Sequence, residues 1–153
     1  MCNMKRNIPT GEANQEIAKI HDRNGLDVAI HDRESYFDTI FVRDVAHFME
    51  RAGMTRRTLT IALAPVMSDG QLYSLLNGNR RPSKRIYVIA IGVVLGLSVD
   101  DMNILLKDSE SRGLDTKRSV GDTVIIYGLA NKKNLADVND MLHEVGAEYV
   151  LFD

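Results

Sequence analysis

The chain has 153 residues, of which 44% are hydrophobic and 26% charged, a composition that excludes global disorder and fits one domain with an appendage. No apolar run approaches the ~20 residues of a membrane-spanning helix, and residues 1–18 lack the apolar stretch of a secretion signal. The single cysteine, Cys2, has no partner for an internal disulfide. We therefore expect a cytoplasmic protein without a membrane segment.

The net charge of −2 is unevenly distributed along the chain. Residues 1–40 carry five Lys/Arg and seven Asp/Glu, residues 41–98 carry eight and three, and residues 99–153 carry six and eleven. A basic middle segment thus lies between two acidic ones. Because local charge governs attraction to phosphate more than total charge does, the composition leaves nucleic-acid binding open for this middle segment.

The first part of the chain is polar and only weakly periodic, so residues 1–34 are predicted to form a mobile N-terminal arm. Within this arm, Glu12–Ile20 has the apolar spacing of a short helix. A His-Asp pair occurs at His21-Asp22 and again at His31-Asp32, but nothing else in the sequence converges on the two pairs. We expect neither a metal site nor another cofactor.

Helical periodicity becomes firm at Tyr36, and apolar residues recur at spacings of three and four until Gly53, where the helix is expected to stop. Four shorter helices are predicted after it, each preceded by a Ser or Thr that can cap its N-terminus. They are Arg56–Ala64 after Thr55, Asp69–Asn77 after Ser68, Lys84–Leu95 after Ser83, and Val99–Leu106 after Ser98. No segment shows strand alternation, so the predicted fold class is all-α, with a five-helix domain over residues 35–108.

An internal repeat with an offset of 36 residues extends into the C-terminal part of the chain. The offset aligns Ser83 with Ser119, Gly92 with Gly128, Asn103 with Asn139 and Leu106 with Leu142. It predicts a second helical hairpin over residues 115–148, followed by a tail at residues 149–153. The hairpin adds apolar faces to a core that is already sufficient, so we expect it to form a dimer surface through Val124, Ile125, Leu129, Val138, Met141 and Leu142.

Two stretches are typical of a known family: Leu75–Ser83, which reads LLNGNRRPS, and Ile91–Asp101, which reads IGVVLGLSVDD. Together with Thr55, Leu59 and Ser68 they resemble the lambda-repressor-like (XRE) helix-turn-helix family over about residues 37–108. Residues 119–145 are similar to the helical extension of some of these regulators. The resemblance implies a five-helix, lambda-repressor-like domain and a regulator of transcription that binds double-stranded DNA.

The physical chemistry of helix ends assigns roles to two of the short helices, Arg56–Ala64 and Asp69–Asn77, of which the second would be the recognition helix. A helix N-terminus offers free N–H groups and a positive dipole end to phosphate, and the first turn of a recognition helix meets base edges in the major groove. The predicted base-contacting residues are Asp69, Gln71 and Ser74. The predicted phosphate-contacting residues are Thr55, Arg56, Arg57, Ser68, Asn79, Arg80, Arg81 and Lys84. One recognition helix reads few base pairs, so a homodimer is expected.

Two features depart from the family pattern. The segment Ala64–Met67 is longer than the usual turn, and Gly70 brings no side chain to the first turn of the recognition helix. An alternative interpretation is therefore an adaptor or antitoxin-like protein, which would contact a protein partner through the acidic C-terminal hairpin or the N-terminal arm. The sequence contains no glycine-rich phosphate loop and no CxxC or HExxH spacing, so neither catalytic residues nor metal ligands are expected.

Overall fold

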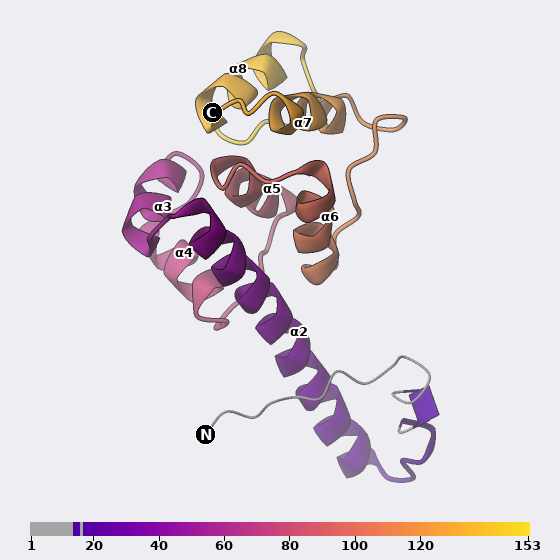
Figure 1. Cartoon of the computed structure of the whole chain (residues 1–153). Coiled ribbons are helices and arrows are strands. Elements are labelled where there is room, and N and C mark those ends of the chain that lie inside the picture. Colours follow the sequence, from indigo (N-terminus) through magenta and orange to yellow (C-terminus); the bar gives the residue numbers. More distant parts are fainter. Residues whose placement is uncertain (1–13, 16) are drawn as a thin grey trace.

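The computed structural model describes residues 14, 15 and 17–153, with the backbone alone for residues 29 and 31–39. All regular elements within these residues are helices (Figure 1). They are α2 (Arg23–Ala52), α3 (Arg56–Leu63), α4 (Asp69–Leu76), α5 (Arg85–Val94), α6 (Val99–Asp108), α7 (Val120–Ala130) and α8 (Leu135–Glu144). The expected all-α class is thereby confirmed for the described residues, and no helix among them is both long and apolar enough to cross a membrane.

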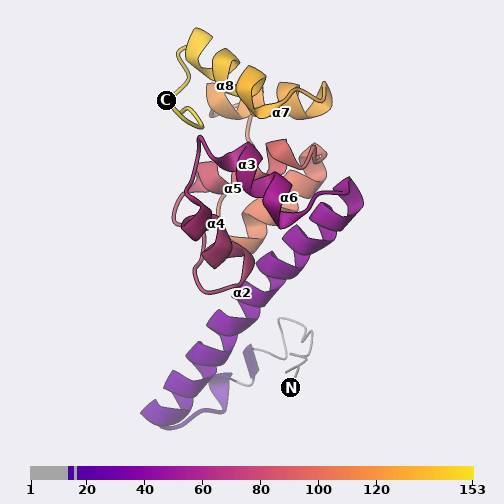
Figure 2. The ribbon, with the colours of Figure 1, turned by 90° about the vertical axis from the view of Figure 1, so that its left-hand side faces the viewer.

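The first long helix begins well before the predicted start at Tyr36. Helix α2 has 30 residues and starts at Arg23, after the N-cap residue Asp22, whose carboxylate accepts a hydrogen bond from the N–H of Gly25. The predicted arm boundary at residue 34 therefore falls inside a helix, while residues 1–13 and 16 of that arm lie outside the described part. A capped helix can propagate through a segment without an apolar face, which is why periodicity placed the start too late. The N-terminal half of α2 extends away from the other helices (Figures 1 and 2).

We call helices α3–α6, together with the C-terminal half of α2, the head of the molecule. In this head, α2 packs on α4 and α6, and its residues Phe41, Val45, Phe48 and Met49 are buried as their spacing predicted. Helix α5 lies at the centre of the core and contacts α3, α6, α7 and α8. Its six consecutive residues Val88–Val93 are all buried. A helix that is apolar on every side needs neighbours on every side, and this requirement brings the head and the C-terminal hairpin together around α5.

The helix caps follow the sequence pattern with one exception. Thr55, Ser68 and Ser98 each accept a hydrogen bond from a backbone N–H in the first turn of the following helix, as predicted. The cap predicted at Ser83 is wrong: α5 starts at Arg85, and the extended N-cap residue Lys84 makes no side-chain capping bond.

The internal repeat is present in the structure at the level of single residues. Helices α6 and α8 begin and end 36 positions apart. A Cβ atom on Gly92 would lie 2.2 Å from the Cε of Met102, and one on Gly128 would lie 2.6 Å from a Cγ of Val138, the residue 36 positions after Met102. The two hairpins therefore share the same close approach between their helices.

The connections between helices repeat as well. Gly96, between α5 and α6, and Lys132, between α7 and α8, both have positive φ angles, of 65° and 54°. Asn103 accepts a hydrogen bond from the N–H of Leu114, and Asn139 accepts one from the N–H of Leu151, both at 2.9 Å. In each hairpin an asparagine side chain thus holds the chain that returns past the second helix.

The apolar faces of the second hairpin are turned into the protein itself. Ile125, Leu129, Val138 and Leu142 are buried, because α7 and α8 pack on each other and on α5. These four side chains are therefore not available for a dimer surface, whereas Val124 and Met141, the other two residues expected there, are half-buried.

Candidate nucleic-acid interface

Helices α3 and α4 form a unit of two eight-residue helices joined by Ala64–Ser68. The N–H groups of Val66 and Met67 both donate to the carbonyl oxygen of Leu63, and the Met67 side chain is buried in the core. The connection between the two helices is thus a hydrogen-bonded turn in which one apolar side chain, Met67, is buried in the core. The inner sides of the two helices are held by Leu59, Leu63, Leu72, Leu75 and Leu76.

Each of the two helices begins with a reciprocal capping box. At α3, Thr55 Oγ accepts from the N–H of Thr58 at 3.2 Å, and Thr58 Oγ accepts from the N–H of Thr55 at 2.9 Å. At α4, Ser68 Oγ accepts from the N–H of Gln71 at 3.2 Å, and Gln71 Oε1 accepts from the N–H of Ser68 at 2.9 Å. The boxes leave other first-turn N–H groups of each helix directed outwards, where an anion can accept from them.

The capping box restricts what Gln71 can offer to a base. A bidentate contact with adenine uses both the amide oxygen and the amide N–H of a glutamine. In Gln71 the oxygen already accepts from Ser68, so this conformation leaves only the N–H group for a new partner. Asp69 is exposed beside it and Ser74 is half-buried.

An arginine and a tyrosine connect the two helices on their outer side. The guanidinium of Arg56 donates to Asn77 Oδ1 at 2.8 Å, and its central carbon lies 5.8 Å from the centre of the Tyr73 ring. Tyr73 is 60% exposed, the largest exposed hydrophobic side chain on α4. Sequence analysis missed Tyr73 and Asn77, although both follow Asp69 at four-residue spacing on one side of the helix.

The remaining predicted phosphate contacts lie mostly at the C-terminal end of α4. The N–H groups of Asn79 and Arg80 both donate to the carbonyl oxygen of Ser74, which turns the chain back after the helix. The Arg81 guanidinium lies 3.5 Å from the carboxylate of Glu110. Thr55, Arg56, Arg57, Ser68, Asn79, Arg80, Arg81 and Lys84 are all exposed.

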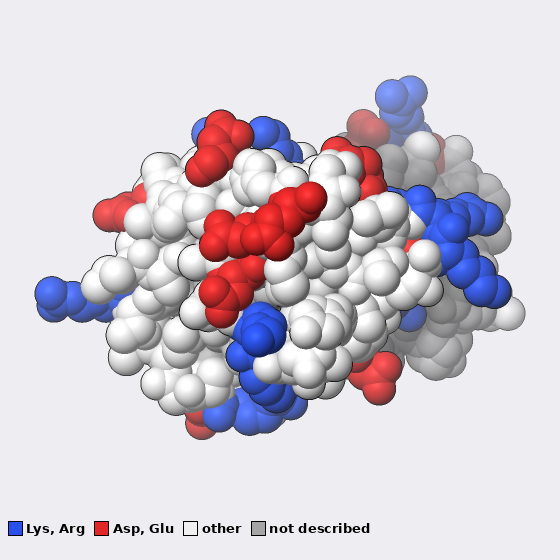
Figure 3. Space-filling model, turned by 90° about the horizontal axis from the view of Figure 1, so that it is seen from above, with Lys and Arg blue, Asp and Glu red and all other residues white. Residues whose placement is uncertain are grey.

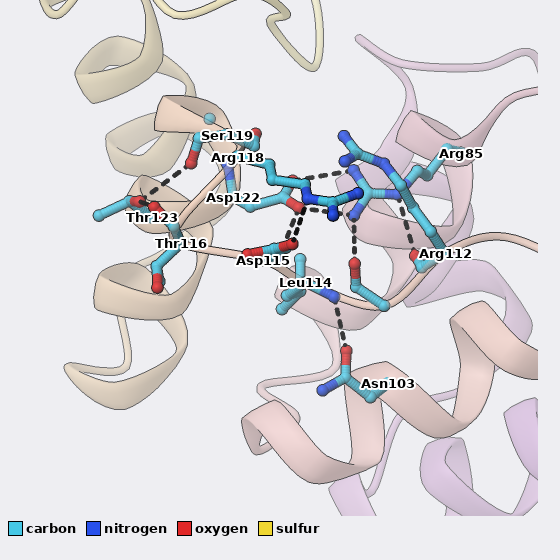
Figure 4. A network of polar contacts seen from close by, with 12 residues as sticks. Arg85, Asn103, Arg112, Leu114, Asp115, Thr116, Arg118, Ser119, Asp122 and Thr123 are labelled. Carbon is cyan, nitrogen blue, oxygen red and sulfur yellow. Dashed lines mark hydrogen bonds and ion pairs between the residues drawn. The ribbon is translucent and has the colours of Figure 1, made fainter.

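A buried ion pair attaches the C-terminal hairpin to the head (Figure 4). The two terminal nitrogens of Arg85 each donate to a different oxygen of Asp122 at 2.8 Å. The Tyr149 hydroxyl donates to the same carboxylate at 2.6 Å, and the N–H of Asp115 donates at 3.0 Å. Arg85 also donates to the carbonyl oxygens of Arg112 and Gly113, so its guanidinium makes four hydrogen bonds in all.

This arrangement shifts the ionisation of all three side chains. Burial on its own raises the pKa of Asp122, but the hydrogen bonds from Arg85, Tyr149 and Asp115 outweigh it and lower that pKa to about 2. Burial and the hydrogen bond to Asp122 raise the pKa of Tyr149. The internal repeat could have indicated this site. The first hairpin has the apolar residue Ile86 at the position where the second has the charged residue Asp122.

The opposite end of the molecule from the projecting part of α2 is acidic. Figure 3 shows acidic side chains grouped across the end that α7 and α8 form. Helix α8 carries three exposed acids, Asp137, Asp140 and Glu144, at spacings of three and four. Such a surface repels a phosphate backbone, so this end of the hairpin is not expected to take part in a nucleic-acid contact made by α3 and α4.

Among the described residues, no three His, Cys, Asp or Glu side chains lie close enough together to hold a metal ion. Comparison of the chain with family models, curated proteins and solved structures found no match.

Proposed function

We propose that this chain is a sequence-specific regulator of transcription that binds double-stranded DNA through α3 and α4 as a helix-turn-helix. The observation that carries the proposal is the pair of capped helices with exposed arginines at their ends, Arg56 and Arg57 at α3 and Arg80 after α4. Helix N-termini and arginines bind phosphates, and the outer side of α4 would then face the major groove.

The binding mode that we propose is a homodimer on a two-part site. One eight-residue recognition helix contacts few base pairs, and two copies double the sequence that is read. Ile125, Leu129, Val138 and Leu142 of the second hairpin are buried within the chain, so the dimer contact is not proposed to use these four side chains. Light scattering at tens of micromolar, with and without DNA, tests this part separately: a monomer under both conditions would contradict it.

The test of DNA binding is a selection from random duplexes, followed by fluorescence anisotropy on the selected and scrambled duplexes at two salt concentrations. We expect selective binding that weakens with salt, and we expect Arg56→Ala to reduce it. Lys117→Ala is the matched control, because Lys117 is exposed before α7 and away from the α3–α4 unit. Failure of the wild-type chain to bind either duplex at low salt would refute the proposal.

A second candidate function is protein binding by the same unit, and exposed apolar side chains favour it. Ile61 on α3 is 65% exposed, and Tyr73 on α4 is 60% exposed. A groove of about 250 Å³ lies where α2 meets the start of α3 and the end of α4, and its lining combines apolar side chains with Glu50, Thr55 and Arg56. Apolar anchors and pockets of this kind are typical of protein interfaces. The absence of DNA binding, combined with a partner whose capture Tyr73→Ala and Ile61→Ser abolish, would favour this function.

A further inference from the structure

The contact between α2 and α6 is attractive at one end and repulsive at the other. The guanidinium of Arg51 on α2 lies 2.6 Å from the carboxylate of Asp101 on α6. Asp108, seven residues after Asp101, lines a small cavity with Phe41 and Val42 of α2. Asp44, seven residues before Arg51, lies on the same stretch of α2 and acts on the Asp108 carboxyl group. The two helices therefore run antiparallel, with a salt bridge and a pair of carboxyl groups separated by about two helical turns.

A hydrogen bond between two carboxyl groups requires one of them to keep its proton. Asp108 is the group that the surroundings favour for it. Its Oδ2 atom is buried, and no described residue forms a hydrogen bond with it. Asp108 is also the last residue of α6, where the negative end of the helix dipole opposes a second negative charge. Burial, the hydrogen bond to Asp44 and the charge of Asp44 raise the pKa of Asp108 to about 7.

The positive groups near this pair do not cancel its charge. Arg43 of α2 and Lys107 of α6 lower the pKa of Asp108, but less than Asp44 and burial raise it. Arg43 lies 3.7 Å from Asp44 and its side chain is 70% exposed to solvent, which screens it. On the other side, Asp108 lines a cavity of about 10 Å³ together with Arg80, Arg81 and Glu110. There the guanidinium of Arg81 lies 3.5 Å from the carboxylate of Glu110, so these two charges offset each other.

We propose that Asp44 and Asp108 form a proton-dependent latch between α2 and α6. In mildly acidic solution one shared proton joins the two helices at this end. Near neutral pH the proton leaves Asp108, two carboxylates then face each other, and the contact loosens here while Arg51 and Asp101 hold the other end as a hinge. The proposal does not depend on DNA binding.

The direct test is a carbon-13 NMR titration of the aspartate carboxyl groups in the full-length protein. We expect the Asp108 signal to titrate with a midpoint near 7, and the backbone amides of residues 43–45 on α2 to shift with the same midpoint. Asp140, an exposed acid on α8 outside this contact, provides the internal reference signal. A midpoint for Asp108 below 5 would overturn the proposal.

Thermal unfolding gives a second readout. The pKa of Asp108 is higher in the folded state than the ordinary value of about 4, so its contribution to stability is complete below pH 4 and is lost as the pH rises to 7. Asp108→Asn, whose amide donates a hydrogen bond at every pH, should therefore gain on the wild type as the pH rises, and its melting temperature relative to the wild type should be about 2–4 °C higher at pH 8 than at pH 5.

Asp44→Asn keeps the test decisive if Asp108→Asn does not fold. It removes the opposing charge, so the Asp108 midpoint should fall by at least one pH unit, a tenfold change in its acid dissociation constant. Asp140→Asn should change neither measurement. Equal differences between wild type and Asp108→Asn at pH 5 and pH 8, or an unchanged Asp108 midpoint in Asp44→Asn, would show that no latch exists.

Discussion

The ammonium group of Lys132 donates a hydrogen bond at 3.1 Å to the carbonyl oxygen of Gly96, the residue that occupies the equivalent position in the first hairpin. Both residues have a left-handed backbone. Glycine adopts this conformation without cost, whereas other residues lose about 1 kcal/mol. The second hairpin thus accepts a local strain at the residue whose side chain binds it to the first.

Substitutions of Lys132 should separate the strain from the hydrogen bond. Lys132→Ala keeps the strain and loses the bond, so we expect it to reduce the free energy of unfolding by about 0.5–1 kcal/mol. Lys132→Gly loses both and should be more stable than the alanine variant by about 1 kcal/mol. Urea denaturation at pH 7 gives the free energy of unfolding of the wild type and of the two variants. Equal values for the two variants would contradict a strained backbone at Lys132.

Gly92 and Gly128, which lie at the close approach between the two helices of each hairpin, should differ in their tolerance of an added methyl group. The Cβ of Gly92→Ala would meet the end of the Met102 side chain, which is flexible and can move. The Cβ of Gly128→Ala would meet a Cγ of Val138, which is stiff because it is branched at Cβ. We expect Gly128→Ala to cost about 2–3 kcal/mol and Gly92→Ala about 1 kcal/mol, although the nominal distance at Gly92 is the shorter. Denaturation curves of both variants give the comparison, and the reverse order would contradict it.

The ion pair between Arg85 and Asp122 should be essential for the stability of the fold, and its contribution to that stability should depend on pH. Arg85→Ala leaves a buried carboxylate without its main partner, so we expect a loss of about 3–5 kcal/mol at pH 7. The pKa of Asp122 is lowered to about 2 in the folded state, so its stabilising contribution is complete above the ordinary value of about 4 and is lost as the pH falls through 2. As the pH is lowered from 5 to 2, the free energy of unfolding should fall steeply in the wild type and less steeply in Asp122→Asn. Parallel curves would exclude this role.

If the proposed DNA binding is correct, residues of the α3–α4 unit should divide into two kinds. Replacing Arg80 and Arg81 with alanine should weaken binding to all sequences alike and lower the log–log salt slope by roughly 0.9 per lost phosphate contact. Gln71→Ala and Tyr73→Ala should cost roughly 1–3 kcal/mol on the selected duplex only. Anisotropy titrations on selected and scrambled duplexes distinguish the two patterns, and a uniform loss for all variants would argue against base contacts by α4.

The parts of the fold that sequence predicted well are those with local causes. Thr55, Ser68 and Ser98 cap helices through bonds to residues three positions away, and apolar spacing located the inner sides of the helices. The 36-residue echo likewise predicted the second hairpin. The start of α2 was missed because the sequence of its N-terminal half is only weakly periodic.

The contacts that were missed join residues far apart in the chain. Arg85 and Asp122 are 37 positions apart, and Asp44 and Asp108 are 64 apart. Neither pair follows a spacing rule, because the packing of whole helices places them together. Gln71 shows a different limit: its place in the first turn predicted a base contact, but the same place allows it to cap its own helix.

The position of α5 determines how the protein can come apart. Because one apolar helix supplies the inner wall of both the head and the hairpin, removing residues 115–153 would strip one side of α5 and expose the charged end of Arg85. Neither part keeps a complete interior alone. We therefore expect a single cooperative melting transition, with calorimetric and van't Hoff enthalpies that agree, and a proteolytic pattern without a stable intermediate cut near residue 115.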